Sequence, residues 1–159
     1  MLLALTEYLD SLPEPTLLVF FGDHRPNITE AENELGLGSN STETPEAILK
    51  AYSVPFMIRA NKAFGERTDI PAAYAALDLP ADHRISDNFL GGIVLELTGH
   101  GGENAFFDFL GGLRRELPVL WPEMDLYVLA DGSVVTELPP ELQAKVDKLD
   151  KWTYYLLRD

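Results

Sequence analysis

The chain has 159 residues, of which 46% are hydrophobic and 24% are charged, and this composition is typical of a globular domain rather than a disordered segment. Its 26 acidic and 12 basic residues give a net charge of −14, and a surface of that sign repels phosphate backbones, so we expect no nucleic-acid partner. The absence of cysteine excludes disulfides, thiolate catalysis, zinc–cysteine sites and iron–sulfur clusters.

The first predicted elements are a short helix and an apolar strand. Residues 2–12 carry leucines at helical spacing on one face, and two prolines follow and end the helix. Residues 16–21 form a continuous apolar run without alternation, which is the pattern of a strand buried on both faces in a parallel sheet. This strand stops at Gly22, and Asp23 and His24 follow it directly.

The middle of the chain is predicted to be less regular. Residues 25–45 are polar and rich in Asn, Ser, Thr and Gly, so we expect a long loop there. A short helix at 46–52 leads to a second apolar strand at 54–60, and another short helix is predicted near 71–77. No stretch reaches the roughly 18 apolar residues that cross a bilayer, so we expect no transmembrane segment.

Two helices are predicted after this region. Ser86 is a candidate N-cap for a helix over residues 87–98, which Gly99 ends. The second helix covers about 103–117 and has phenylalanines and leucines along its apolar face.

The last part of the sequence predicts a hairpin and a terminal helix. Segments 125–129 and 133–136 flank an Asp-Gly turn, which favours a β-hairpin, and the helix runs from about 140 to 157. Helices and apolar strands alternate in the earlier part, so the fold class is predicted to be α/β. We treat 1–159 as one segment, with an α/β part at 1–117 and the hairpin plus terminal helix at 118–159.

The most specific chemical feature is the Gly22-Asp23-His24 sequence at the end of the first strand. Ligands in open α/β sheets collect beyond the carboxyl ends of the strands. A carboxylate and an imidazole suit Mn²⁺, Zn²⁺ or Mg²⁺, although two adjacent ligands do not complete a site. The alternative is that Asp23 caps a turn and that His24 is an ordinary loop residue.

Two arginines follow the two apolar strands and are candidate contacts for a substrate phosphate. These are Arg25 and Arg59, and the alternative for both is a salt bridge on this acidic protein. His83 and His100 are weaker candidates, and we interpret both as loop residues.

The segment from Leu17 to Pro26 resembles the metal-binding strand of lipoteichoic acid synthase-like phosphotransferases and sulfatases, in the alkaline phosphatase superfamily. Four further segments resemble later landmarks of that family in the same order, at 52–61, 85–91, 106–119 and 152–159. The resemblance spans nearly the whole chain, and its specificity comes from the order of the segments rather than from any one motif.

The resemblance implies a partial alkaline-phosphatase-like sheet flanked by helices. It also implies a metal-dependent phosphoryl or glycerol-phosphate transferase, or a hydrolase of sulfuric or phosphoric esters. In that family a threonine nucleophile, activated by bound Mn²⁺ or a similar ion, attacks the ester, and Asp23 and His24 match two of the metal ligands. The family's nucleophile and first acidic ligand lie upstream of the Asp23 position, so we expect this chain to lack them and to be inactive alone.

The same resemblance implies where the parent protein works. It would be anchored in the cell membrane, with an extracellular catalytic domain whose substrate is a phosphate or sulfate ester such as a lipid head group. This chain itself is expected to be soluble.

Two other hypotheses follow from the residues. In the first, the chain is a non-catalytic binding or assembly module, and an exposed sheet edge joins two copies into a homodimer. In the second, it is a complete small metal-dependent hydrolase, in which Glu30, Glu32 or Glu34 supplies the further ligands.

Overall fold

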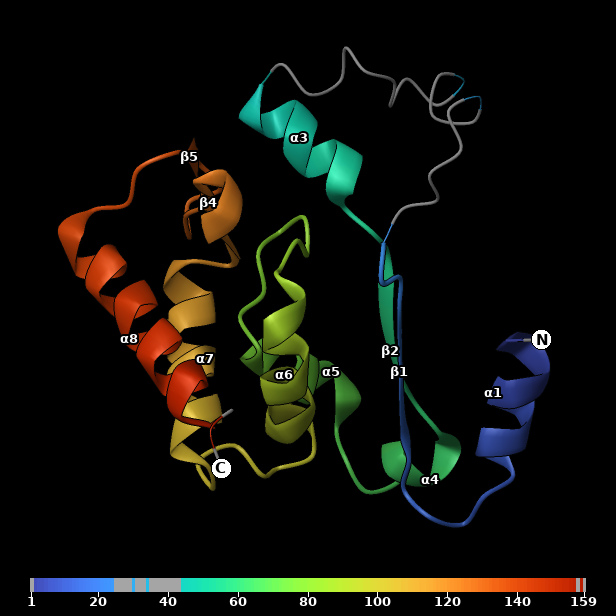
Figure 1. The fold of residues 1–159 in the computed structure, drawn as a ribbon. Coiled ribbons are helices and arrows are strands. Elements are labelled where there is room, and N and C mark those ends of the chain that lie inside the picture. The colour runs from blue at the N-terminus through green and yellow to red at the C-terminus, as the bar shows by residue number, and fades with distance from the viewer. Residues whose placement is uncertain (1, 25–29, 31–33, 35–43, 157, 159) are drawn as a thin grey trace. The chain divides into compact units, whose positions relative to one another are not determined.

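The fold was analysed in a computed structural model that describes residues 2–24, 30, 34, 44–156 and 158. Helices and small antiparallel sheets alternate along the chain, so the predicted α/β class is confirmed (Figure 1). The chain divides into two compact units, Met1–Ala73 (unit 1) and Tyr74–Asp159 (unit 2), and each is described by itself.

Unit 1 is built around a two-stranded sheet with short helices before, between and after the strands. Its elements are α1 (Leu2–Asp10), β1 (Leu17–Phe21), α3 (Pro45–Tyr52), β2 (Phe56–Ala60) and α4 (Lys62–Gly65). Thr44 caps α3 by accepting a hydrogen bond from the Ala47 amide at 3.2 Å, and Pro45 occupies the first turn, where a missing N–H costs nothing. The unit boundary falls within α5 (Ile70–Ala76), close to the predicted helix.

The sheet of unit 1 differs from the prediction. β1 pairs antiparallel with β2, with Leu17 opposite Ala60 and Phe21 opposite Phe56, so the predicted parallel arrangement is wrong for these two strands. Neither strand is buried on both faces, and Phe20 is 50% exposed. Apolar side chains on both faces of β1 are half covered, which explains the absence of alternation without a parallel sheet.

Unit 2 contains the remaining helices and a three-stranded antiparallel sheet. In order they are η2 (Asp87–Phe89), α6 (Leu90–Leu97), α7 (Ala105–Glu116), β3 (Val119–Trp121), η3 (Pro122–Met124), β4 (Leu126–Val128), β5 (Val134–Val135) and α8 (Pro140–Leu156). The β4–β5 hairpin and the terminal helix confirm the prediction, and β3 is an unpredicted third strand beside β4. None of the described helices combines the length and apolar character needed to cross a membrane.

The ends of α6 and α7 show which capping predictions hold. Gly99 follows α6 with a φ of +78°, a left-handed conformation that glycine adopts readily, as predicted. Ser86 occupies the N-cap position of η2, as predicted, but its side chain makes no capping bond. Its hydroxyl instead accepts a hydrogen bond from the Leu120 amide at 2.9 Å and donates one to the Leu120 carbonyl at 3.1 Å.

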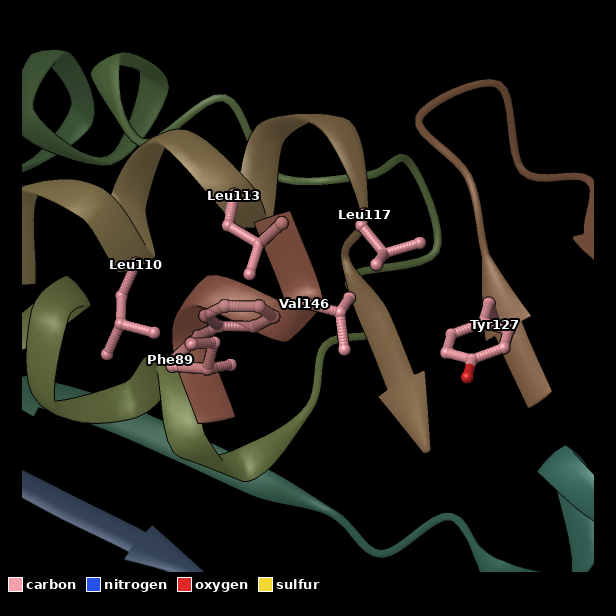
Figure 2. Close-up of a cluster of buried hydrophobic side chains, with 7 residues drawn as sticks. Phe89, Leu110, Leu113, Leu117, Tyr127 and Val146 are labelled. Carbon is pink, nitrogen blue, oxygen red and sulfur yellow. The ribbon is translucent and has the colours of Figure 1, made fainter. Parts of the chain in front are cut away.

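The core of unit 2 is a cluster of buried apolar side chains contributed by η2, α7, β4 and α8 (Figure 2). Phe89, Leu113 and Val146 are each at most 2% exposed, and Figure 2 shows them converging between the helices. Full burial of one such side chain contributes about 1.5–3 kcal/mol, so this cluster is the main stabilising feature of the unit. Residues from the 1–117 part and from the 118–159 part of the sequence share this core.

Candidate functional site

Asp23 and His24 lie just beyond the end of β1, where the sequence predicts a metal site. Their side chains are 84% and 76% exposed, and Asp23 Oδ2 lies 3.6 Å from His24 Nε2. The His24 amide donates a hydrogen bond to Asp23 Oδ1 at 3.0 Å, which orients the carboxylate. Gly22 permits the chain to pass close to Val54, two residues before β2, because a Cβ there would lie 3.0 Å from Val54 Cβ.

The donor pair fits one divalent ion in part. Two donors about 2.1 Å from an ion at a tetrahedral angle lie about 3.4 Å apart, close to the separation observed. Within the described ranges, however, no group of three or more His, Asp or Glu side chains is arranged to hold a metal ion. Glu30 and Glu34 are described and exposed, whereas Glu32 lies outside the described residues.

Arg59 takes part in an ion pair with Asp10. Its two guanidinium nitrogens donate to the two carboxylate oxygens at 3.2 and 2.6 Å. The hydrogen bonding from Arg59 lowers the pKa of Asp10 from its usual value, and the same bond raises the pKa of Arg59. The salt-bridge alternative is therefore what the structure contains, and a role in substrate binding stays a prediction.

The strand register separates Arg59 from the Asp23–His24 pair. Arg59 lies opposite Leu18, five residues before Asp23, and five residues of strand span about 16 Å. In a parallel sheet the carboxyl ends of both strands would have lain at one edge, but the antiparallel pairing places them at opposite ends. The other candidate, Arg25, lies outside the described residues.

Asn61 organises the start of β1 and was not identified from the sequence. Its side chain is buried and uses every donor and acceptor it has. Oδ1 accepts hydrogen bonds from the Thr16 and Phe64 amides, both at 2.9 Å. Nδ2 donates to the Leu9 and Glu14 carbonyls, again both at 2.9 Å. Asn61 thereby joins the end of α1, the start of β1 and α4, and so fixes the strand that carries Asp23.

A second Asp-His-Arg sequence occurs at residues 82–84, and its local structure differs. His83 has a φ of +56°, and its Nδ1 lies 2.9 Å from the Tyr74 hydroxyl. Asp82 Oδ1 accepts a hydrogen bond from the Arg84 amide at 3.1 Å, which is the geometry of a turn. The imidazole is thus engaged by a neighbouring aromatic hydroxyl, in keeping with its interpretation as a loop residue.

His100 and the glycines beside it form a turn that is stabilised internally. His100 Nδ1 lies 2.9 Å from Glu103 Oε1, and the Gly102 amide donates to Asp108 Oδ1 at 2.7 Å. The carboxylate of Asp108 therefore already occupies the amide that an external anion would need.

Unit 2 also buries a charge that the sequence did not reveal. Arg114 is 1% exposed, and it donates hydrogen bonds to the Leu77 carbonyl at 2.6 Å and to both carboxylate oxygens of Glu96 at 3.2 Å. Arg115 donates to the same carboxylate at 3.0 Å. The partners lie 18 or more positions away, so no local spacing pattern points to this network.

Comparison with known proteins finds no family model, no curated protein and no solved structure that matches this chain. The resemblance to lipoteichoic acid synthase-like enzymes therefore stays a prediction from the sequence.

Proposed function

We propose that this chain contributes two metal ligands, Asp23 and His24, to the centre of a metal-dependent phosphoryl or glycerol-phosphate transferase, or of a sulfuric or phosphoric ester hydrolase. The single observation that supports this proposal is the placement of a carboxylate and an imidazole, 3.6 Å apart and exposed, at the carboxyl end of β1. A bound Mn²⁺ or similar ion would activate a hydroxyl nucleophile and stabilise charge on the ester oxygens.

The residues of this chain have limited roles in such a site. Asp23 would supply a carboxylate oxygen and His24 a ring nitrogen, while Gly22 and the Asn61 network hold the strand that presents them. The resemblance implies that the threonine nucleophile and the remaining acidic ligand are residues that this chain does not carry. The chain alone is then expected to bind metal weakly and to be inactive. The parent would act on an ester at the outer face of the cell membrane.

Paramagnetic line broadening by Mn²⁺ in the NMR spectrum of the purified chain tests this proposal, because it detects weak binding at defined residues. Substoichiometric Mn²⁺ should broaden the signals of Gly22 and His24 more strongly than those of His83. The Asp23→Ala/His24→Ala double variant should lose this broadening. The Asp82→Ala/His83→Ala variant is a matched control from the second Asp-His-Arg sequence and should keep it.

Two other outcomes of these experiments would contradict the proposal. Equal broadening at His24 and His83 would mean that Mn²⁺ binds non-specifically to the acidic surface, and the proposal would be wrong. Calorimetric binding at micromolar Mn²⁺, with turnover of a nitrophenyl phosphodiester, would instead establish the complete small hydrolase.

A further inference from the structure

The outer edge of β1 carries backbone amides and carbonyls that form no hydrogen bond with any described residue. The Asn61 amide donates to the Thr16 carbonyl at 2.9 Å, and the Gly22 amide donates to the Pro55 carbonyl at 3.0 Å. Because bonded and non-bonded pairs alternate along an antiparallel ladder, the backbone of every second residue from Thr16 to Gly22 faces β2. The amides and carbonyls of Leu17, Val19 and Phe21 therefore face away from β2.

The sequence of β1 lacks two of the features that usually protect an edge strand from pairing. β1 contains no charged residue and no proline, whereas β2 carries Arg59 and follows Pro55. The sheet of unit 2 provides a contrast, since the backbone of its strand β3 is bonded at Leu120 by the Ser86 hydroxyl. A two-stranded sheet is also only marginally stable by itself, and a third strand improves its stability considerably.

We propose that a second copy of this chain pairs with β1, antiparallel and centred on Val19, to form a continuous four-stranded sheet. In this register Val19 faces Val19 and Leu17 faces Phe21. All three residues whose backbones point outward therefore meet outward-pointing partners, so the edge is complementary to itself. The pairing also covers part of Phe20 and Phe21, which are 50% and 49% exposed.

The charge of the chain sets how the proposed dimer responds to salt. Each copy carries a net charge of −14, so repulsion between the two copies weakens the dimer at low salt. Association should therefore strengthen as the salt concentration rises.

Cysteine cross-linking tests the register, because the chain has no cysteine of its own. In the proposed dimer the two Val19 Cα atoms lie about 5.5 Å apart, which a disulfide spans. The two Leu17 Cα atoms are offset by four residues, about 13 Å, which it does not span. Under mild oxidation without metal, Val19→Cys should form the covalent dimer at least tenfold faster than Leu17→Cys. An equal mixture of Leu17→Cys and Phe21→Cys should cross-link as heterodimers.

A proline variant tests the edge without breaking the sheet within one chain. The Val19 amide faces outward, so Val19→Pro removes a bond to the second copy and none to β2. Sedimentation should show this variant as a monomer and Val19→Thr, which keeps the amide, as a dimer. Cross-linking of Val19→Cys no faster than Leu17→Cys, or a wild type that stays monomeric at high salt, would overturn the proposal.

This inference is independent of the proposed function. Asp23→Ala/His24→Ala should cross-link through Val19→Cys as fast as the chain with both ligands. Loss of Mn²⁺ broadening and loss of the dimer are therefore separate results.

Discussion

Replacing Asn61 by alanine should destabilise unit 1 by about 3–4 kcal/mol. The side chain is 3% exposed and makes four hydrogen bonds, each 2.9 Å long. A neutral hydrogen bond contributes about 1 kcal/mol, and alanine would leave the Thr16 and Phe64 amides and two carbonyls without their partner. Thr44→Ala is the matched control in the same unit, because it removes one exposed capping bond of 3.2 Å and should cost about 1 kcal/mol or less.

Native-state hydrogen exchange of the Leu18 and Phe20 amides measures these effects, since both face β2. Their opening free energy should fall by about 3–4 kcal/mol in Asn61→Ala. Asn61→Asp separates the network from helix capping alone, because aspartate is an equally good cap but turns an oxygen toward the Leu9 and Glu14 carbonyls. Wild-type protection in Asn61→Asp, or equal losses in Asn61→Ala and Thr44→Ala, would refute the reasoning.

Two further predictions concern ion pairs. Both Arg114 and Arg115 contact Glu96, but the Arg114 side chain is 1% exposed and the Arg115 side chain 41%. Arg114→Met should therefore lower the free energy of unfolding in urea by about 3–5 kcal/mol, and Arg115→Met by less than about 1 kcal/mol. Both tryptophans lie in unit 2, so their fluorescence reports this unfolding, and equal costs would contradict the burial argument. Arg59 lowers the pKa of Asp10 below 3.8, so the pair stabilises unit 1 at higher pH, and this stability is lost as pH falls through the folded-state value. Asp10→Asn should remove that part of the acid sensitivity in a pH titration of hydrogen exchange, and an unchanged acid profile would mean that the pair contributes nothing.

Sequence patterns predicted the elements whose signals are local. The Asp-Gly turn between β4 and β5 and the positive φ at Gly99 both follow from residues within a few positions of each other. The direction of β1 relative to β2 could not be predicted from the sequence. An apolar run of five residues is compatible with half-covered faces in an antiparallel pair as well as with a buried strand in a parallel sheet. Strand direction depends on where the partner strand enters, and that is set by the intervening chain.

The buried polar groups were beyond sequence reasoning for the same reason. Three of the four hydrogen bonds of the Asn61 side chain reach residues 45 to 52 positions away, and Ser86 bonds to Leu120, 34 positions away. A local rule assigned Ser86 to a helix cap because a serine before a helix usually has that role. The competing bond to the edge of β3 satisfies both an amide and a carbonyl, which one capping bond cannot do.

The two Asp-His-Arg sequences show why position rather than composition decides the candidate site. At residues 82–84 the aspartate bonds to the amide two positions ahead, and the histidine lies 2.9 Å from a tyrosine hydroxyl. At residues 23–24 the aspartate bonds to the next amide, and its second oxygen lies 3.6 Å from the imidazole Nε2 just beyond the end of β1. Coordination requires donors that converge on the position of one ion. A metal ion that selects residues 23–24 over 82–84 would therefore be recognising their position at the end of β1, and not the dipeptide itself.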